Sequence, residues 1–188
     1  MNIYSLVGPS GCGKTTVLNS LVKRKFSIMK EEYMGSFHSS LNNKQVLSKW
    51  NWISRWFERV LDCNDEKIDL IITDRCPIEV VPYAINGNSL MSPILKSFEE
   101  LKKYHNIDIK TIYLRVDFDE LMRRITLRLE KEQDRKQYSE TDIEFSKNVF
   151  LFYEQYISNI WTYTVNVSEE NIETISQSII ELIGKSND

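Results

Sequence analysis

The sequence predicts an α/β protein with three layers, in which helices cover both faces of a five-stranded parallel β-sheet. Two observations support this prediction. Short, largely apolar runs alternate with segments of helical periodicity along the 188 residues, a pattern that is typical of parallel sheets. In addition, the first run leads directly into a glycine-rich loop and a helix. The length suits one domain, and we expect a single domain over residues 1–188.

The five expected strands are the apolar, β-branched runs. They lie at residues 3–7, 26–29, 68–73, 109–116 and 161–167. Helices are expected between them, the first at residues 14–23 and a long one at residues 45–61. The long helix carries a stripe of apolar residues at helical spacing, expected to face the core. This stripe consists of Val46, Trp50, Ile53, Phe57 and Val60.

Several short motifs predict where helices begin and end. Asp117-x-x-Glu120 and Thr141-x-x-Glu144 have the spacing of capping boxes. Ser92 is expected to be an N-cap before a proline at the first helical position, and Gly184 a C-cap.

Composition restricts the function classes. Charged residues make up 27% of the chain and the formal net charge is -3, so no overall attraction to nucleic acid or anionic membranes is expected. Cys12, Cys63 and Cys76 are widely spaced without metal-ligand spacing, which suits free thiols in a reducing compartment. The first strand leaves no room for a signal peptide, and no apolar run is long enough for a membrane span. We therefore expect a cytoplasmic protein without membrane partners.

Residues 8–15, GPSGCGKT, fit the phosphate-loop pattern G-x-x-x-x-G-K-[ST] in the strand-loop-helix setting that it requires. Its backbone amides and the following helix N-terminus are expected to hold a nucleoside triphosphate, with Lys14 on the terminal phosphates and Thr15 on Mg²⁺. The alternative is a glycine-rich turn that matches by chance. The expected ATP-binding residues of the loop are Gly8, Ser10, Gly11, Cys12, Gly13, Lys14, Thr15 and Thr16.

Polar residues follow the expected strands, where ligands of open parallel sheets bind. Asp74 ends the third run and is a candidate for the Mg²⁺ shell or for an acceptor hydroxyl, and Arg75 is a candidate for a second phosphate or the acceptor. The alternative is that Asp74 caps a helix while Arg75 lies in solvent. Lys30 and Glu31 follow the second run.

A cluster of cations follows the fourth run. Arg124, Arg128, Lys131 and Arg135 have the spacing of one helical face, and arginines on a closing lid stabilise the charge that spreads over a transferred phosphate. The alternative is a solvated basic face, offset by the nearby acids. These acids are Glu130, Glu132 and Asp134.

The long helix also carries Trp52, Arg55, Trp56 and Arg59, roughly opposite its apolar stripe. Indole rings beside arginines can stack on a nucleobase. The alternative is that the two tryptophans pack between helices.

The chain resembles the small P-loop kinases of the thymidylate kinase and deoxynucleoside kinase superfamily. The resemblance covers most of the chain and rests on GPSGCGKTT, IITDRCP, IYLRVDFDELMRRITLR and, less specifically, FSKNVFLFYEQY. It implies a P-loop kinase fold with an arginine-rich lid at about residues 124–140. It also implies that Lys14 and Thr15 bind the donor phosphates and Mg²⁺. Asp74 and Arg75 are expected to face the acceptor, and three further arginines are expected to belong to the lid. These are Arg124, Arg128 and Arg135.

One part of the pattern departs from both families. Lys30-Glu31 falls where thymidylate kinases carry Arg-Glu-Pro, and the nucleoside kinases carry a Glu-Pro carboxylate that acts as a base. The proline is absent here, so the counterpart of this base is either Glu31, which we take as the catalytic candidate, or Glu32. A nucleoside acceptor needs such a base, whereas a monophosphate acceptor needs cations.

The sequence and the resemblance together predict an ATP- and Mg²⁺-dependent kinase of a nucleoside or nucleoside monophosphate, with a deoxynucleotide or thymidylate-type acceptor favoured. The alternatives are a kinase of another hydroxyl acceptor, such as a nicotinamide riboside or a modified base in DNA, and a nucleotide-driven switch. The switch is disfavoured because Asp74-Arg75-Cys76-Pro77 stands where a GTPase carries Asp-x-x-Gly. Nucleic acid is disfavoured by the net charge, and a homodimer is left open.

Overall fold

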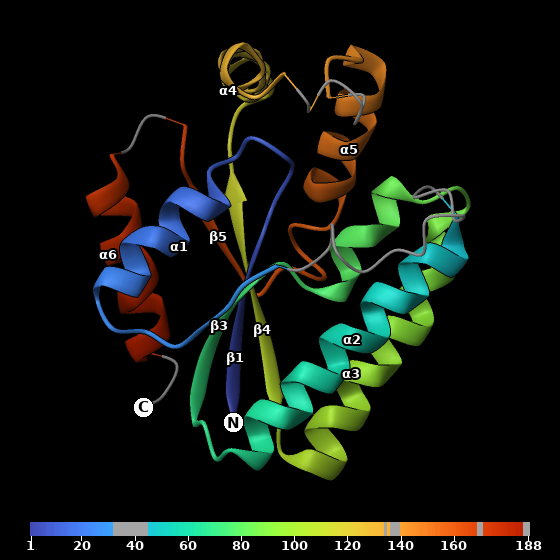
Figure 1. Cartoon of the computed structure of the whole chain (residues 1–188), viewed down its shortest axis with the longest axis vertical. Helices are drawn as coiled ribbons and strands as arrows, with labels where there is room; N and C mark the ends of the chain where they lie inside the picture. The colour runs from blue at the N-terminus through green and yellow to red at the C-terminus, as the bar shows by residue number, and fades with distance from the viewer. Residues whose placement is uncertain (32–44, 134, 136–139, 169–170, 186–188) are drawn as a thin grey trace. The chain divides into compact units, whose positions relative to one another are not determined.

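The computed structural model describes residues 1–31, 45–133, 135, 140–168 and 171–185 (Figure 1). Its five strands form one sheet in the order β2-β3-β1-β4-β5. β2 pairs with β3 in parallel, with Ile28 opposite Ile72, and β4 pairs with β5 in parallel, with Leu114 opposite Val165. The strands are β1 (Asn2–Val7), β2 (Ile28–Met29), β3 (Leu70–Asp74), β4 (Asp108–Arg115) and β5 (Tyr163–Asn166).

Helices connect the strands, so the predicted α/β fold with a five-stranded parallel sheet is confirmed. The α-helices are α1 (Lys14–Lys23), α2 (Val46–Asp65), α3 (Met91–His105), α4 (Phe118–Lys131), α5 (Ile143–Gln155) and α6 (Ile172–Lys185). Two 3₁₀ helices, η2 (Pro77–Tyr83) and η3 (Gly87–Leu90), precede α3. Among the described residues, no helix combines the length and apolar character needed to cross a bilayer.

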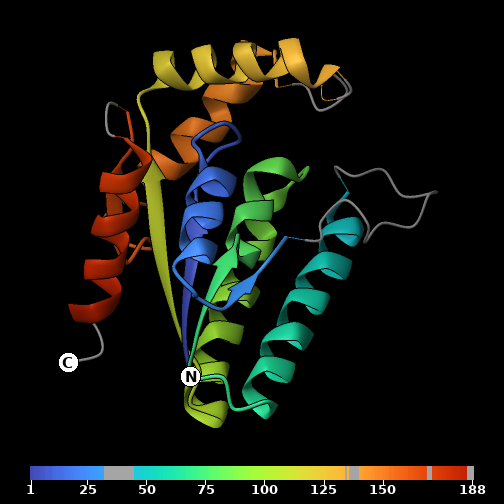
Figure 2. The ribbon, with the colours of Figure 1, turned by 60° about the vertical axis from the view of Figure 1, so that its left-hand side comes forward.

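The chain divides into two compact units, and the first comprises residues 1–5 and 27–110. In it, α2 and α3 run alongside one another (Figure 2), and Trp56 and Phe57 of α2 both meet Phe98 of α3 at ring distances of 6.1 and 6.0 Å. β3 buries Ile71 and Ile72 completely or nearly so. These contacts form the core beneath the α2 face.

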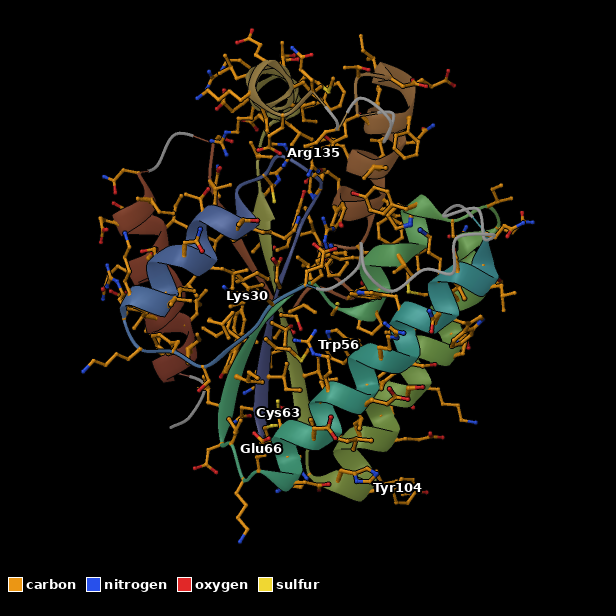
Figure 3. The ribbon with its side chains drawn as sticks, viewed as in Figure 1. Lys30, Trp56, Cys63, Glu66, Tyr104 and Arg135 are labelled. Atoms are coloured by element: carbon orange, nitrogen blue, oxygen red, sulfur yellow. The ribbon has the colours of Figure 1, made fainter. Side chains whose placement is uncertain are left out.

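The buried face of α2 differs from the predicted stripe. Trp50 was expected in the core but is 37% exposed, whereas Trp52 and Trp56 are 4% and 3% exposed. Trp56, which lies outside the predicted stripe, meets Phe98 of α3 (Figure 3 labels Trp56). Ile53 and Val60 are buried as expected.

The second unit comprises residues 6–26 and 111–188. α1 packs against α6, and Arg24, just after α1, donates to Glu173 of α6 at 2.6 Å. Tyr113 of β4, Tyr153 of α5 and Trp161 form a buried aromatic cluster with ring distances of 5.5 to 6.1 Å. The cluster joins β4, which precedes the arginine-rich segment, to α5, which follows it.

The predicted helix ends need correction at three places. The capping residue of α5 is Asp142, one residue after the predicted Thr141, and its carboxylate accepts from Phe145 N–H at 3.1 Å. α3 begins at Met91 because η3 runs directly into it, so Ser92 lies inside the helix and does not cap it. Gly184 is a residue of α6 and not its C-cap.

The fourth predicted cap is confirmed in position only. Asp117 is the N-cap of α4, but its side chain makes no capping hydrogen bond. Glu120 of the predicted box instead accepts from Arg123 at 2.6 Å and from Arg124 at 2.7 Å. Both oxygens of Glu120 are thus engaged by guanidinium groups in charge-assisted hydrogen bonds.

Candidate active site

The glycine-rich loop lies in the second unit, after β1, and ends where α1 begins. Gly11 has φ 91° and Gly13 has φ 108°, a left-handed region that residues with a Cβ rarely adopt. A Cβ on Gly11 would also lie 2.9 Å from Ile125 Cγ1. The backbone therefore requires both glycines. Gly13 occupies the N-cap position of α1, so no side chain at that position binds the first amides of the helix.

Lys14 places its ammonium within the loop. Its Nζ donates to the carbonyl oxygen of Gly8 and, at 3.2 Å, to that of Pro9. The same Nζ lies 3.7 Å from the sulfur of Cys12. Lys14 is only 6% exposed, so a phosphate that enters the loop meets a cation that has already lost most of its water.

The donors around this loop fit a polyphosphate. Thr15 and Thr16 are exposed at the start of α1, where helix amides favour anions and a hydroxyl oxygen suits Mg²⁺. In addition, the buried Nε of Arg128 has no hydrogen-bond acceptor within the described part of the chain. Thr15 and Asp74 belong to different units, and the metal site that would join them stays a prediction.

Arg124 of α4 anchors the loop from outside. Its Nη1 donates to the carbonyl of Cys12 at 3.2 Å, and its Nη2 donates to the carbonyls of Val167 at 2.7 Å and Ser168 at 3.1 Å. Its Nε donates to Glu120 at 2.7 Å. Nη1 and Nη2 thus link the loop to the residues that follow β5, while Nε pairs with an acid of the same helix. A role of Arg124 in transfer stays a prediction.

Arg128 and Arg135 converge on the loop with a carboxylate between them. Arg128 Nη2 donates to Ser10 Oγ at 3.0 Å and to both oxygens of Glu140 at 2.9 Å. Arg135 Nη2 donates to Glu140 Oε1 at 2.7 Å, and Ser10 Oγ donates to the same oxygen at 2.7 Å. We call these four residues the lid cluster (Figure 3 labels Arg135).

The lid cluster corrects one prediction. Arg135 was expected on one helical face with the other cations, but α4 ends at Lys131 and Arg135 lies beyond it. Arg135 nevertheless binds Glu140, through the hydrogen bonds of its Nε and Nη2. The alternative of a basic face offset by local acids holds in part, since Arg135 Nε lies 3.7 Å from Glu132; Asp134 lies outside the described residues.

Sequence analysis missed Glu140. The side chain is 8% exposed, and burial acts to raise its pKa. Hydrogen bonds from Arg135 and Ser10, with the charges of Arg128 and Arg135, outweigh burial and hold the pKa of this carboxyl below its usual value. The available signal was a lone carboxylate shortly after clustered cations, but the sequence does not show how the chain turns.

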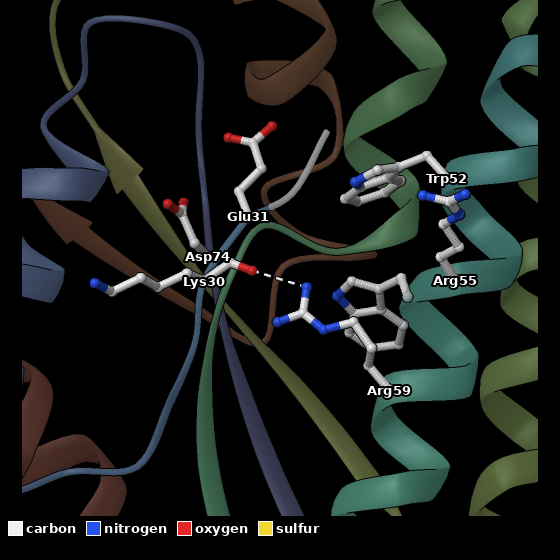
Figure 4. Close-up of a pocket in the computed structure, with 7 residues that line it drawn as sticks. Lys30, Glu31, Trp52, Arg55, Arg59 and Asp74 are labelled. Atoms are coloured by element: carbon white, nitrogen blue, oxygen red, sulfur yellow. Dashed lines mark hydrogen bonds between the residues drawn. The ribbon is translucent and has the colours of Figure 1, made fainter. Parts of the chain in front are cut away.

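A second candidate site, in the first unit, is a pocket at the ends of β2 and β3 (Figure 4). It brings together side chains that the sequence predicted from three separate segments. They are Lys30, Glu31, Trp52, Arg55, Trp56, Arg59 and Asp74. Both tryptophans are buried, as the packing alternative expects, and both still line the pocket.

Hydrogen bonds from α2 fix the pocket walls. Arg59 Nη1 donates to the carbonyl of Lys30 at 2.9 Å, and Trp56 Nε1 donates to the carbonyl of Arg75 at 3.2 Å. Thr73 Oγ1 also lies 2.9 Å from that carbonyl. Arg75 has φ 75°, an uncommon conformation for a residue with a side chain, and these two bonds hold it there.

Arg75 joins the pocket carboxylate to the interior. Its Nε lies 2.9 Å from Glu31 Oε2, and its Nη1 lies 3.6 Å from Glu79, which is 1% exposed. The helix after β3 is capped by Cys76 and not by Asp74, so the alternative of a capping Asp74 with Arg75 in solvent is wrong. Glu32, the other candidate base, lies outside the described residues.

A family profile described as AAA domain matches residues 5–145, which is most of the chain and includes the loop, the pocket and the lid cluster. The protein belongs to this family. As an AAA domain it is a P-loop protein, which implies nucleotide binding by the loop. A comparison with curated proteins found no match.

Solved structures resemble this AAA domain over nearly its whole length. Deoxyadenosine kinase from M. mycoides with dCMP and dCDP has a TM-score of 0.61 at 18% identity, covering 98% of this chain and 100% of its own. The YorR protein of Bacillus subtilis, in complex with phosphorylated GDP, has a TM-score of 0.61 at 19% identity, covering 98% and 97%. At these identities the likeness shows the fold alone, and it confirms that the fold is P-loop kinase-like.

A buried lysine beside the pocket predicts a pH dependence of stability in this AAA domain. Lys49 of α2 is 2% exposed; burial, and then the charge of Arg75, lower its pKa from 10.5 to about 8. Between these pH values the unfolded chain binds more protons, so the free energy of unfolding should rise from pH 8 to pH 10.5. The rise should reach about 2–3 kcal/mol.

Urea unfolding from pH 7.5 to 10 checks this prediction in the wild type, in Lys49→Met and in Lys96→Met, which alters an exposed lysine of α3. The pH-dependent rise should be lost in Lys49→Met and kept in Lys96→Met. Identical pH profiles in all three proteins would show that Lys49 is not the titrating group.

Proposed function

We propose that this protein is an ATP-dependent phosphotransferase that phosphorylates a hydroxyl of a nucleoside, with a deoxynucleoside as the favoured acceptor. The observation that carries the proposal is the pocket of the first unit, where the carboxylates of Glu31 and Asp74 share one cavity with two indoles of α2. A nucleoside presents an aromatic base and a weakly acidic hydroxyl, and these are the two chemical features that such a lining recognises.

The phosphate loop supplies the donor site in this proposal. Its amides and the start of α1 bind the phosphates of ATP, and Lys14 moves from the carbonyls that it now contacts to the terminal phosphate oxygens. Thr15 is the hydroxyl ligand for Mg²⁺, which supplies charge neutralisation when bound. Arg128 and Arg135 stabilise the charge on the moving phosphoryl group.

Glu31 is the proposed general base at the acceptor site. It accepts the proton of the acceptor hydroxyl as the hydroxyl oxygen bonds to the terminal phosphorus of ATP and the bond from that phosphorus to ADP breaks. Arg75 holds the Glu31 carboxylate through a contact of 2.9 Å. Trp52 and Trp56 offer their rings to the base, because both line the pocket and a hydrogen bond to the Arg75 carbonyl holds Trp56.

Three cations favour a second candidate, in which the acceptor is a nucleoside monophosphate. Lys30, Arg55 and Arg59 line the same pocket, and a phosphate on the acceptor would be attracted to them. We place this candidate second because the guanidinium of Arg59 is already engaged with the Lys30 carbonyl, and Figure 4 shows the ammonium of Lys30 directed away from the α2 side chains.

The similar solved structures support this proposal at the level of the fold. The structures of deoxyadenosine kinase and of YorR were solved with nucleotides bound, and the same fold accommodates such ligands there. The other candidates are a nicotinamide riboside-type acceptor, a modified base in DNA and a nucleotide switch, and each predicts a different acceptor requirement.

The test is ADP release from Mg-ATP across nucleosides, nucleoside monophosphates, nicotinamide riboside and single-stranded DNA, with a no-acceptor control. We expect release that depends on a nucleoside, with deoxynucleosides preferred. Release with monophosphates alone would favour the second candidate. Equal release in every well would show hydrolysis or a switch, and the kinase proposal would be wrong.

A further inference from the structure

The lid cluster contains an anion supplied by the protein itself. Glu140 accepts from Arg128, Arg135 and Ser10 at 2.7 to 2.9 Å, and one of these donors, Ser10, is a residue of the phosphate loop. Two guanidinium groups and a hydroxyl are the donors expected for a phosphate oxygen. In this structure they surround a carboxylate.

The carboxylate is held firmly in this position. The carbonyl of Glu140 accepts from Ser146 Oγ of α5 at 3.0 Å, which fixes the backbone, and the side chain is 8% exposed. A buried carboxylate is costly unless it is paired and hydrogen-bonded. The pairing with two arginines lowers its pKa and keeps it charged.

The cluster retains capacity for a further anion. Two guanidinium groups face one buried carboxylate; the other acid near them, Glu132 at 3.7 Å from Arg135 Nε, is 54% exposed, so solvent screens its charge. The buried Nε of Arg128 also has no acceptor among the described residues. A terminal phosphate entering from the loop would therefore be attracted, but it would compete with Glu140 for the N–H groups of Arg128 and Arg135.

We propose that Glu140 is a positioning residue that holds Arg128 and Arg135 at the phosphate loop and exchanges places with the terminal phosphate of the donor. ATP carries the terminal phosphate that competes with Glu140 and ADP does not, so Glu140 reduces the affinity for ATP more than the affinity for ADP. The inference rests on ATP being the donor, as proposed above, but not on the identity of the acceptor.

The experiment is isothermal titration calorimetry of Mg-ATP, Mg-ADP and inorganic tripolyphosphate with the full chain, without acceptor. The variants are Glu140→Gln, Glu140→Asp and the control Glu144→Gln, which removes the same charge from an exposed position of α5. Because Gln keeps the volume but not the charge, Glu140→Gln should bind ATP and tripolyphosphate about tenfold more tightly, with little change for ADP. Glu140→Asp should lie in between, and Glu144→Gln should behave as the wild type.

A merely structural role of Glu140 would lower the affinity for ATP and ADP alike. Unchanged or weaker ATP binding by a folded Glu140→Gln, with normal ATP binding by the wild type, would overturn this inference alone. If Glu140→Gln does not fold, as judged by thermal unfolding, equal ATP affinity in Glu140→Asp and the wild type would overturn it. If the wild type binds none of the three ligands, both this inference and the proposed function are wrong.

Discussion

Replacement of Lys14 by alanine is expected to lower phosphoryl transfer from ATP by a factor on the order of a hundred to a thousand, the loss that follows removal of one preorganised donor. Lys14 is the buried cation of the phosphate loop, and its Nζ contacts only atoms of that loop in the hydrogen bonds described above. Its loss removes the charge that the donor phosphates meet. The measurement is ADP formation with the acceptor that the panel identifies.

Lys23→Ala is the matched control, since Lys23 is an exposed lysine at the other end of α1. The control should retain activity, and both variants should remain folded by circular dichroism. Lys14→Ala leaves the Gly8 and Pro9 carbonyls without this donor, which costs about 1–2 kcal/mol of stability. Transfer at the wild-type rate in a folded Lys14→Ala protein would contradict the donor assignment.

Glu31→Gln is expected to lower kcat on the order of a hundredfold or more while leaving KM for the nucleoside within a few-fold. The amide keeps the size of the side chain but cannot accept the hydroxyl proton. The rings of Trp52 and Trp56 remain in the pocket, so binding of the base should persist. Steady-state kinetics with varied acceptor measure the two parameters separately.

Glu66→Gln serves as the control, because Glu66 is an exposed glutamate just after α2 and does not line the pocket. An increase in KM at constant kcat in Glu31→Gln would make Glu31 a binding residue instead of a base. Full activity of Glu31→Gln would leave Asp74, at the end of β3, as the pocket carboxylate that accepts the proton.

The positions of the strands could be predicted closely, because a buried parallel strand appears in the sequence as an apolar run, which is visible without knowing the strands that it pairs with. The run predicted at residues 68–73 corresponds to β3, which spans Leu70–Asp74. The first helix was predicted with its observed bounds, Lys14–Lys23. The phosphate loop could also be predicted from the sequence, since its glycines are required by local backbone angles that only glycine adopts readily.

Features that depend on distant partners could not be predicted. Trp50 and Trp52 are equally apolar in sequence, yet Trp52 is buried and Trp50 is partly exposed, because burial depends on which elements pack against α2. The predicted cap at Thr141 failed by one residue because Asp142 offers the better acceptor. Arg135 was assigned to a helix that ends four residues earlier, at Lys131.

The sequence by itself determined the order of strands and helices, the phosphate loop and the chemical types available to each site, because periodicity and loop angles are local properties. Only the tertiary structure placed Glu31, Asp74 and the two indoles around one pocket, and only it set Glu140 between Arg128, Arg135 and Ser10. Ion pairs and pockets form between segments that are distant in sequence, and their geometry depends on how the chain turns between them, which no local pattern encodes.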